Sequence, residues 1–365
     1  MNQSASKAPC AIDLFCGVGG LSLGLTLAGF DLIGAVDSDQ KVLDSFKSNF
    51  KRTSVARQDL FTCSGAKIRR DLRIGNKRID VLVGGPPCQG FSVGGISAKS
   101  DERNEGVLAF ARIVTELRPR YFVMENVGGL LAKKHAWRRR RFNRTVSKAG
   151  YAMLPLQSLN ASDFGVPQRR KRVFVVGCAD GEVVPSYPLP STGYRPTVRD
   201  AIGDLLPLDR YCSDYDADEY DGPFGSVSEF AKPLRICPEG KIVKQITGCL
   251  RTNHSPTVVE RFRATKPGGQ EEISRYYRLA WSGVSPTLRA GTGPDHGSHT
   301  APRPIHPSKP RCITVREAAR LHSFPDWFQF HPTKWHGFRQ IGNSVPPYLA
   351  KAVFLQIYDA LVQTH

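Results

Sequence analysis

The sequence lacks the features that mark membrane proteins, disulfide scaffolds and zinc sites. No apolar run reaches the length that spans a bilayer, and residues 1–9 are polar, unlike a signal peptide. The nine cysteines form no C-x-x-C pair and no His/Cys cluster at zinc spacing. We therefore expect a cytoplasmic protein with reduced thiols, no bound metal and no membrane partner.

Acidic residues are also scarce. The 365 residues include 33 Asp and Glu against 51 Lys and Arg, which gives a formal charge of +18. This excess favours a polyanionic partner through phosphate contacts and counterion release, although a merely basic protein has the same composition. The hydrophobic fraction of 40% is adequate for a sizeable core, and the length fits one large domain plus a smaller one.

Short apolar runs alternate with longer amphipathic ones up to residue 176, which predicts a parallel sheet with crossover helices. The expected strands are residues 11–15, 32–36, 79–83, 121–124 and 172–177, and the expected helices include 21–28, 107–117, 315–322 and 346–362. After residue 179 the sequence becomes rich in Pro, Gly, Ser and Thr. We predict an α/β fold with a Rossmann-like, mostly parallel sheet in residues 1–185 plus 337–365, and a smaller irregular domain in 186–336.

One cysteine stands in a distinctive frame. The segment Gly84-Gly85-Pro86-Pro87-Cys88-Gln89-Gly90-Phe91-Ser92 directly follows the strand expected at 79–83. Cys88 is thereby placed at the carboxyl edge of a parallel sheet, where open α/β sheets bind their ligands. Two prolines fix the backbone before the thiol, and the flanking glycines suit a loop that moves. This pattern predicts a reactive cysteine rather than a structural one.

Together with Glu125-Asn126-Val127, this segment resembles the signature pair of the DNA cytosine-5 methyltransferases. The likeness runs in order from about Ala11 to about Val353, and only the middle, roughly residues 180–310, falls outside it. It implies a monomeric bacterial modification enzyme that transfers a methyl group from S-adenosylmethionine to C5 of a cytosine flipped out of a specific double-stranded DNA sequence. Whether a cognate restriction endonuclease acts separately is left open.

A strand, a Gly-rich turn and a helix open the chain, with Cys16-Gly17-Val18-Gly19-Gly20 at the turn. Glycines let the backbone approach a ligand, although this spacing alone is a weak signal. Asp37 and Asp59 follow the next two segments, where they can accept hydrogen bonds from a ribose and an adenine. In the resembling family this pocket holds S-adenosylmethionine, and the matching positions are Phe15, Gly17, Gly20, Asp37, Asp59, Pro87, Asn343, Ser344 and Val345. The family commonly has Glu where Asp37 stands.

The reaction itself needs two groups. Cytosine C5 becomes nucleophilic when a thiolate adds at C6 and N3 is protonated or hydrogen-bonded, and the resemblance gives these roles to Cys88 and Glu125. In Gln168-Arg169-Arg170-Lys171-Arg172, alternation along a strand points Arg170 and Arg172 to one face. The resemblance assigns Arg172 to the cytosine carbonyl, with Arg170 beside it. A solvated turn is the alternative interpretation of this cluster.

Three further segments are candidates for DNA contact. Gln89 and Ser92 are expected to fill the gap left by the flipped base or to contact phosphate. Residues 191–310 are expected to read the sequence, with Thr287-Leu288 resembling a Thr-hydrophobic pair found in that region of the family. Seven Lys and Arg lie around Trp137, and because they circle a helix a solvated face is favoured over phosphate contact.

Three alternative functions remain open. An RNA cytosine-5 methyltransferase of the transfer-RNA type shares most of these motifs, but the long middle domain and the basicity favour DNA. A non-catalytic DNA-binding regulator of the same fold should have lost the thiol or the acid, and Cys88 and Glu125 are both present. A nicotinamide-dependent oxidoreductase is supported by the Gly-rich turn alone and leaves Pro-Pro-Cys-Gln unexplained. The recognised DNA sequence cannot be derived from these residues.

Overall fold

The computed structural model describes residues 8–87, 106–207, 218–291 and 303–363. The chain forms two compact units, and both are discontinuous in sequence. The first consists of Met1–Asn160, Lys171–Leu189 and Leu349–His365, and the second of Ala161–Arg170 and Pro190–Tyr348. This division differs from the expected one in three places, the first being that the first unit extends to Leu189 rather than to residue 185. The short segment Ala161–Arg170 belongs to the second unit, and the chain returns to the first unit at Leu349 rather than at residue 337.

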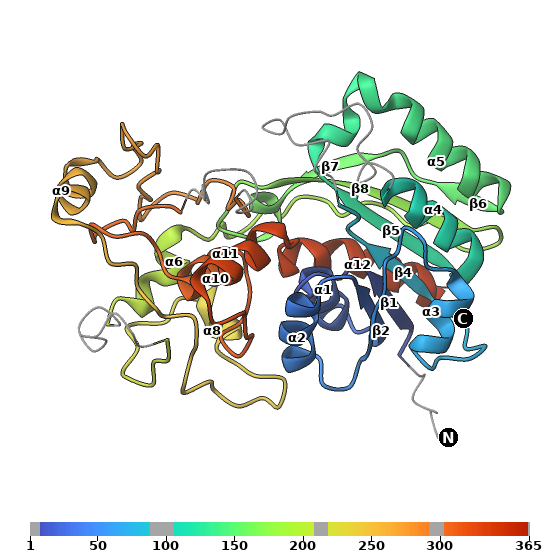
Figure 1. Cartoon of the computed structure of the whole chain (residues 1–365), viewed down its shortest axis with the longest axis horizontal. Coiled ribbons are helices and arrows are strands. Elements are labelled where there is room, and N and C mark those ends of the chain that lie inside the picture. The colour runs from blue at the N-terminus through green and yellow to red at the C-terminus, as the bar shows by residue number, and fades with distance from the viewer. Residues whose placement is uncertain (1–7, 88–105, 208–217, 292–302, 364–365) are drawn as a thin grey trace. The chain divides into compact units, whose positions relative to one another are not determined.

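A single sheet organises the first unit (Figure 1). Within the described residues its strands are β1 (Cys10–Leu14), β2 (Asp31–Asp37), β3 (Ser54–Arg57), β4 (Val81–Gly84), β5 (Tyr121–Asn126), β6 (Tyr151–Met153), β7 (Gln157–Asn160) and β8 (Lys171–Ala179). Their order is β3-β2-β1-β4-β5-β8-β6, with β7 also pairing to β8. The most central strands are almost wholly apolar and buried, as expected for parallel strands covered on both faces.

The sheet is parallel from β3 to β5 and antiparallel beyond it. β1 pairs in parallel with β2 and β4, whereas β8 runs antiparallel to β5, β6 and β7. The α/β class and the mostly parallel sheet are therefore confirmed, but the segment expected at 172–177 is not one of the parallel strands. The chain builds outward from β1 to β3 and then from β4 to β5, so the topological switch point lies between β1 and β4.

Helices cover both faces of this sheet (Figure 1). The first unit contains α1 (Gly20–Leu27), α2 (Gln40–Asn49), α3 (Gly65–Asp71), α4 (Gly106–Leu117), the short η2 (Gly128–Leu131) and η3 (Lys133–His135), α5 (Ala136–Lys148) and most of α12 (Pro347–Gln363). The side chains of Ile12 and Leu14 join one core with Ile68 of α3, Phe110 of α4 and Phe142 of α5. These three helices therefore lie on one face.

Alternation along β1 places α1 on the other face, because Asp13, between Ile12 and Leu14, accepts a hydrogen bond from Ser22 of α1. α12 packs closely on α1. A Cβ added at Gly24 would lie 2.4 Å from the Cβ of Ala350, so only glycine permits this approach. The C-terminal helix is thus tied to the first helix of the chain.

The second unit has little regular structure in its described part. It contains η4 (Ala161–Phe164), α6 (Val198–Ile202), η5 (Gly203–Leu205), α8 (Ala231–Leu234), α9 (Pro256–Ala264), α10 (Val315–Leu321) and α11 (Lys334–Asn343). Isolated bridges, such as the pairing of Gln168 with Ser285, take the place of strands there. Among the described residues, no helix is both long and apolar enough to cross a membrane. That part of the chain also contains no group of His, Cys, Asp and Glu arranged to hold a metal ion.

Candidate active site

Three neighbouring strands end side by side at the switch point of the sheet. The register pairs Leu14 of β1 with Gly84 of β4, and Gly84 with Met124 of β5. The residues that follow these pairs are Phe15, Gly85 and Glu125. Because ligands of open α/β sheets bind at the carboxyl ends of the strands flanking the switch point, the fold itself selects this edge.

The Gly-rich turn after β1 depends on left-handed backbone. Phe15, Gly17 and Gly19 have φ values of 53°, 55° and 103°, a region that non-glycine residues rarely adopt. A Cβ at Gly19 would lie 2.4 Å from the ring of Phe50, whereas a Cβ at Gly17 would meet nothing within 4 Å. The turn is therefore packed from behind at Gly19 and open at Gly17, which leaves its backbone accessible to a ligand.

Asp37, at the end of β2, holds this turn. Its Oδ2 accepts a hydrogen bond from the Gly17 N–H at 2.9 Å, and its Oδ1 accepts one from the Asp39 N–H at 3.0 Å. Burial raises the pKa of the Asp37 carboxyl, and these backbone donors oppose that effect. Each carboxylate oxygen can still accept a further hydrogen bond, so Asp37 can orient the turn and bind a hydroxyl at the same time.

Asp59 is brought to the same edge by an aromatic contact. It lies exposed after β3, and its Oδ1 caps the local turn by accepting from the Phe61 N–H at 2.9 Å. The ring of Phe61 meets that of Phe15 edge to face, with centroids 6.1 Å apart. Four of the sequence-predicted cofactor positions, Phe15, Gly17, Asp37 and Asp59, are thus linked within the first unit.

Asp13 was missed by the sequence analysis. Its carboxyl is wholly buried, Ser22 Oγ donates to its Oδ2 at 2.6 Å, and its Oδ1 has no hydrogen-bond partner among the described residues. Burial raises the pKa of Asp13 to about 7. The signal in the sequence is a single acidic residue inside the apolar run 11–15, because a charged group is costly to bury without a partner.

Glu125 forms the clearest charged contact of the site. The carboxylate, at the end of β5, is 7% exposed, and its Oε1 lies 2.7 Å from Nε of Arg172 in β8. This ion pair follows from the register of the antiparallel strands β5 and β8, which places Glu125 opposite Phe174. Arg172 is two residues before Phe174, so its side chain lies on the same face of the sheet as that of Glu125. A buried carboxylate and a guanidinium are thereby presented together at the strand ends.

The neighbouring Asn126 secures the segment that leads to Cys88. Its Nδ2 donates to the carbonyl of Pro86 at 3.3 Å, and its Oδ1 accepts from the Val127 N–H at 2.9 Å. Pro87 is half-buried, and a Cβ at Gly106 of α4 would lie 3.3 Å from its Cδ. Cys88, Gln89 and Ser92 lie outside the described residues.

Arg170, expected beside Arg172, has a different environment. Its guanidinium is wholly buried and donates to the carbonyls of Leu288 at 2.7 Å, Gly342 at 2.6 Å and Ser344 at 2.7 Å. The two arginines therefore have different partners, Arg172 the carboxylate of Glu125 and Arg170 backbone carbonyls of the second unit.

Leu288, expected at the DNA, is also buried, with 4% of its surface exposed. Its N–H donates to Oε1 of Gln168 at 3.1 Å, and its carbonyl accepts from Arg170, so its side chain belongs to the core. Thr287 is half-buried, and its hydroxyl donates to the carbonyl of Arg169 at 2.6 Å. This pair therefore anchors residues 168–170 within the second unit.

The remaining cofactor positions, Asn343, Ser344 and Val345, lie at the end of α11 in the second unit. The hydroxyl of Ser344 donates to the carbonyl of Gln340 at 2.7 Å, and Val345 is buried. The carbonyl of Ser344 also lies 3.1 Å from Nε2 of His322. These contacts fix the backbone of the segment.

Comparison with known proteins assigns the family. The family model described as C-5 cytosine-specific DNA methylase matches residues 10–359. The chain belongs to this family. The Type II methyltransferase M.XorII of Xanthomonas oryzae pv. oryzae is 46% identical over 97% of this chain and 85% of the relative. The Type II methyltransferase M1.HphI of Haemophilus parahaemolyticus is 33% identical over 94% and 84%.

Solved structures agree with this assignment. The crystal structure of a prophage-encoded E. coli protein, described as a DNA modification methyltransferase, has a TM-score of 0.82 and 36% identity, covering 97% of this chain and all of that one. The S. pombe Dnmt2 methyltransferase has a TM-score of 0.62 at 16% identity, which shows the fold alone. The family resemblance of the chain and the enzyme class predicted from it, a DNA cytosine-5 methyltransferase, are confirmed.

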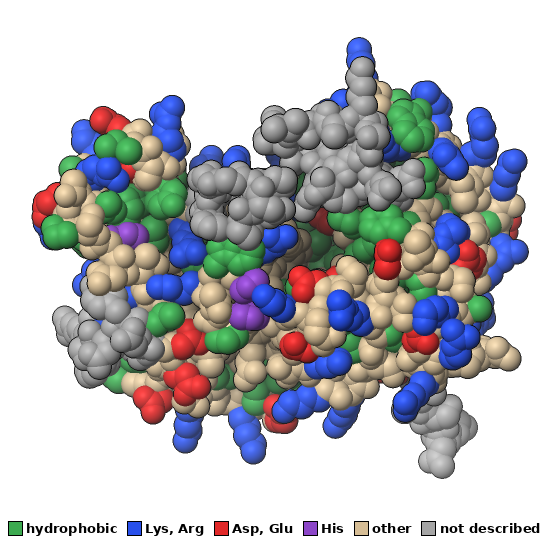
Figure 2. Space-filling view, in the orientation of Figure 1, with side chains coloured by type: hydrophobic (Ala, Val, Ile, Leu, Met, Phe, Trp, Pro, Cys, Tyr) green, Lys and Arg blue, Asp and Glu red, His purple; other side chains and the backbone are tan. Residues whose placement is uncertain are grey.

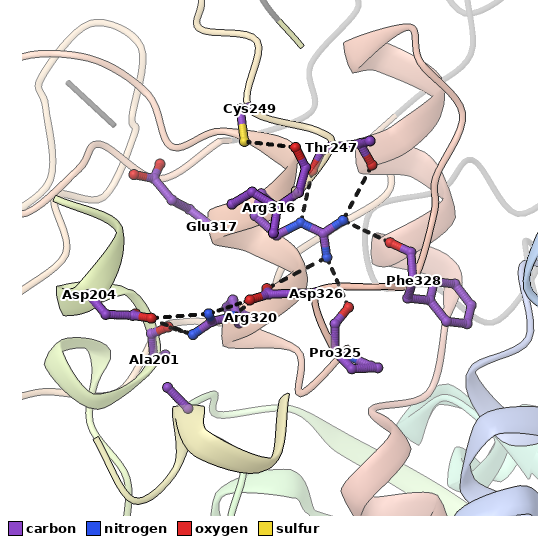
Figure 3. Close-up of polar contacts among 12 residues, drawn as sticks. Ala201, Asp204, Thr247, Cys249, Arg316, Glu317, Arg320, Pro325, Asp326 and Phe328 are labelled. Carbon is purple, nitrogen blue, oxygen red and sulfur yellow. Dashed lines mark hydrogen bonds and ion pairs between the residues drawn. The ribbon is translucent and has the colours of Figure 1, made fainter. Parts of the chain in front are cut away.

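The methyltransferase also contains a buried arginine network that the sequence analysis did not recognise (Figure 3). Arg320 of α10 is wholly buried and pairs with Asp326, with Nε 2.6 Å from Oδ1, and with Asp204, with Nη2 3.2 Å from Oδ2. Arg316, one turn earlier, donates to the carbonyls of Thr247, Pro325 and Phe328. Figure 3 shows both guanidinium groups enclosed by these partners, so they hold segments of the second unit together.

Proposed function

We propose that this methyltransferase transfers a methyl group from S-adenosylmethionine to C5 of a cytosine flipped out of double-stranded DNA, through a covalent bond between Cys88 Sγ and C6. The observation that carries the proposal is the Glu125–Arg172 ion pair of 2.7 Å, next to the Pro86 carbonyl that Asn126 holds. These contacts support a fixed acid and a fixed guanidinium at the strand end that leads into Cys88. This is the set of groups that addition to a pyrimidine requires.

The chemistry proceeds in two halves. The Cys88 thiolate adds to C6, and a proton held by Glu125 and shared with N3 moves electron density to C5. C5 would then take up the methyl group supplied by S-adenosylmethionine, whose methyl–sulfur bond breaks to leave S-adenosylhomocysteine. A base then removes the C5 proton, the electrons of that bond re-form the C5–C6 double bond, and the C6–Sγ bond breaks to return the thiolate. Arg172 binds the cytosine carbonyl and orients Glu125.

The cysteines in the described part of the chain are poor candidates for the nucleophile. Burial raises the pKa of the Cys10, Cys16, Cys63, Cys178 and Cys312 thiols, which disfavours the thiolate. Cys249 is buried as well, and Cys237, half-buried, lies in the second unit. This leaves Cys88 and Cys212, which both lie outside the described residues, and the sequence frame at the carboxyl edge of the sheet favours Cys88.

The described residues of the first unit fit the proposed cofactor. The turn at Gly17 is open, so the cofactor could approach its backbone. Asp37 would accept a hydrogen bond from the ribose hydroxyls. The rings of Phe15 and Phe61, together with Asp59, would contact the adenine. When bound, S-adenosylmethionine supplies an electrophilic methyl group. We further propose that residues 191–310 read the DNA sequence, that the protein acts as a monomer, and that any cognate restriction endonuclease acts separately.

Substitution of Cys88 by serine tests the proposal directly. Serine keeps the shape and loses the low-pKa nucleophile, so methyl transfer should vanish while S-adenosylmethionine binding persists. Cys237→Ser, at the half-buried cysteine, is the matched control and should retain activity. DNA containing 5-fluorocytosine should trap a covalent complex with the unaltered enzyme and none with Cys88→Ser. Turnover by Cys88→Ser, or no adduct with active enzyme, would refute attack at C6.

A further inference from the structure

A basic surface that plays no part in the proposed chemistry lies just after the Glu125 strand. From Asn126 to Ser162 the sequence contains eight Lys and Arg and no Asp or Glu. All eight are on α5 or on η3 directly before it. In Figure 2 their blue side chains project at the upper right, where Figure 1 places α5. So one-sided a stretch is unlike an ordinary solvated helix, in which both signs alternate.

Two of these arginines have structural roles. Arg139 donates to the carbonyls of Leu130 and Ala132, which closes the short helices before α5. Arg138 lies against His135, and its guanidinium stacks 4.4 Å above the ring of Trp137. The others are exposed and form no ion pair or side-chain hydrogen bond with any part of the chain that the structure describes: Lys133, Lys134, Arg140, Arg141, Arg144 and Lys148.

The exposed charges on α5 lie on one side of the helix, although Arg138 and Arg139 point elsewhere. At 3.6 residues per turn, Arg140, Arg141, Arg144 and Lys148 fall within an arc of about 100°, and Trp137 lies inside the same arc. The buried Phe142 and Val146 lie on the opposite side. We call these five residues the basic face of α5. Trp137, at 44% exposure, is its only large apolar side chain.

We propose that the basic face of α5 is a second DNA-binding surface, which contacts duplex phosphates outside the recognised sequence. The inference rests on the proposed function, because it assumes a DNA substrate at the Glu125 edge. α5 begins ten residues after Asn126, so its N-terminal end lies toward the carboxyl edge of the sheet. The cations of the basic face then span about 12 Å of the helix, from Arg140 to Lys148. A duplex carries one charge per roughly 1.7 Å of axis, so such a stripe can face several phosphates.

Charge and shape favour duplex DNA over a membrane as the occupant. A membrane-bound helix needs a broad exposed apolar face, and here Trp137 stands alone among cations. An exposed Trp flanked by arginines suits a nucleic-acid backbone, where the ring packs on sugars while guanidinium groups reach phosphates. Since no acidic residue of the segment competes for these cations, they remain available to an external polyanion.

The triple variant Arg140→Gln, Arg141→Gln and Arg144→Gln tests this surface. Each lost phosphate contact should reduce the slope of log affinity against log salt by about 0.9, so three contacts should reduce it by about 2.7. The affinity ratio of parent to variant for non-specific duplex DNA should then shrink roughly 40-fold between 50 and 200 mM salt. Fluorescence anisotropy of a labelled duplex measures both quantities.

Two controls separate this surface from total charge. Lys47, in the last turn of α2, and Lys51 and Arg52, just after that helix, are also exposed, so their Gln triple removes the same charge elsewhere in the first unit. It should leave the salt slope unchanged, and Arg→Lys at 140, 141 and 144 should preserve it. An unchanged slope in the α5 variant, or equal losses in both Gln triples, would overturn the proposal.

Methyl incorporation into plasmid DNA is measured in parallel, so that the two proposals can fail separately. If the parent enzyme methylates DNA but the α5 variant shows no change in the salt slope, the proposed function stands and the proposed second DNA-binding surface is wrong. Slope loss confined to the α5 variant supports the surface even if the parent protein transfers no methyl group, in which case the proposed function is wrong.

Discussion

Replacing Arg170 by methionine separates a catalytic role from a structural one. The guanidinium donates three hydrogen bonds, to the carbonyls of Leu288, Gly342 and Ser344, and is wholly buried. Methionine fills similar space and leaves these carbonyls without that donor. A buried acceptor left unpaired costs about 1 to 3 kcal/mol, and Ser344 also has His322 Nε2 at 3.1 Å, so roughly two acceptors are orphaned.

We therefore expect Arg170→Met to destabilise the second unit by about 3 to 5 kcal/mol, or roughly 10 °C in its melting temperature. Urea unfolding followed by tryptophan fluorescence is the appropriate assay, because three of the four tryptophans, Trp281, Trp327 and Trp335, belong to that unit. The matched variant is Arg172→Met, at the residue paired with Glu125, which should lose turnover with a smaller loss of stability. Normal stability of Arg170→Met with abolished turnover would refute the structural role.

Three further predictions concern the first unit. Glu125→Gln should lower kcat by about 10²- to 10⁴-fold with DNA affinity nearly unchanged, because a proton donor is lost at N3; equal losses in both would indicate a structural role. Asp37→Asn should weaken S-adenosylmethionine binding by about tenfold in calorimetry, since the amide has one oxygen and cannot accept from the Gly17 and Asp39 N–H groups on separate oxygens, whereas the exposed Asp31→Asn should not. Burial raises the pKa of Asp13 from 3.8 to about 7, so the folded state retains a proton that the unfolded chain releases and stability should fall by up to roughly 4 kcal/mol between pH 4 and 7. Asp13→Asn should abolish that pH dependence in urea titrations, and the same dependence in both proteins would contradict it.

The sequence was sufficient for the central parallel strands of the first unit because local patterns and tertiary packing agree there. The buried strands β1, β4 and β5 are short apolar runs, and the parallel arrangement that such runs favour is the one observed. The turn at Gly17 could also be located, since glycine spacing reflects a backbone requirement. Phe15, by contrast, was expected to end a strand and instead has a φ of 53°, which no side-chain pattern reveals.

The sequence analysis failed where the burial of a residue depends on distant contacts. Arg170 and Leu288 were assigned from the family resemblance, but Arg170 donates to carbonyls 118 and 172 residues away and Leu288 is buried. Asp13 lies in an apolar run, and its burial depends on α1 packing over it. Such residues are determined by tertiary structure rather than by local spacing, so a single sequence carries little information about them.

The distribution of arginines changes what the net charge of +18 means for DNA binding. Arg320 is neutralised by Asp326 and Asp204, and Arg170 and Arg316 are wholly buried among carbonyls, so none of them can reach a phosphate. Counterion release depends only on cations that contact phosphates, so total composition overstates the electrostatic footprint. The exposed cations between Lys133 and Lys148 have no such partners among the described residues, and there the charge excess is available to DNA. If this reasoning is right, removing three charges from α5 will alter salt dependence more than removing three from any surface where acidic neighbours already compensate them.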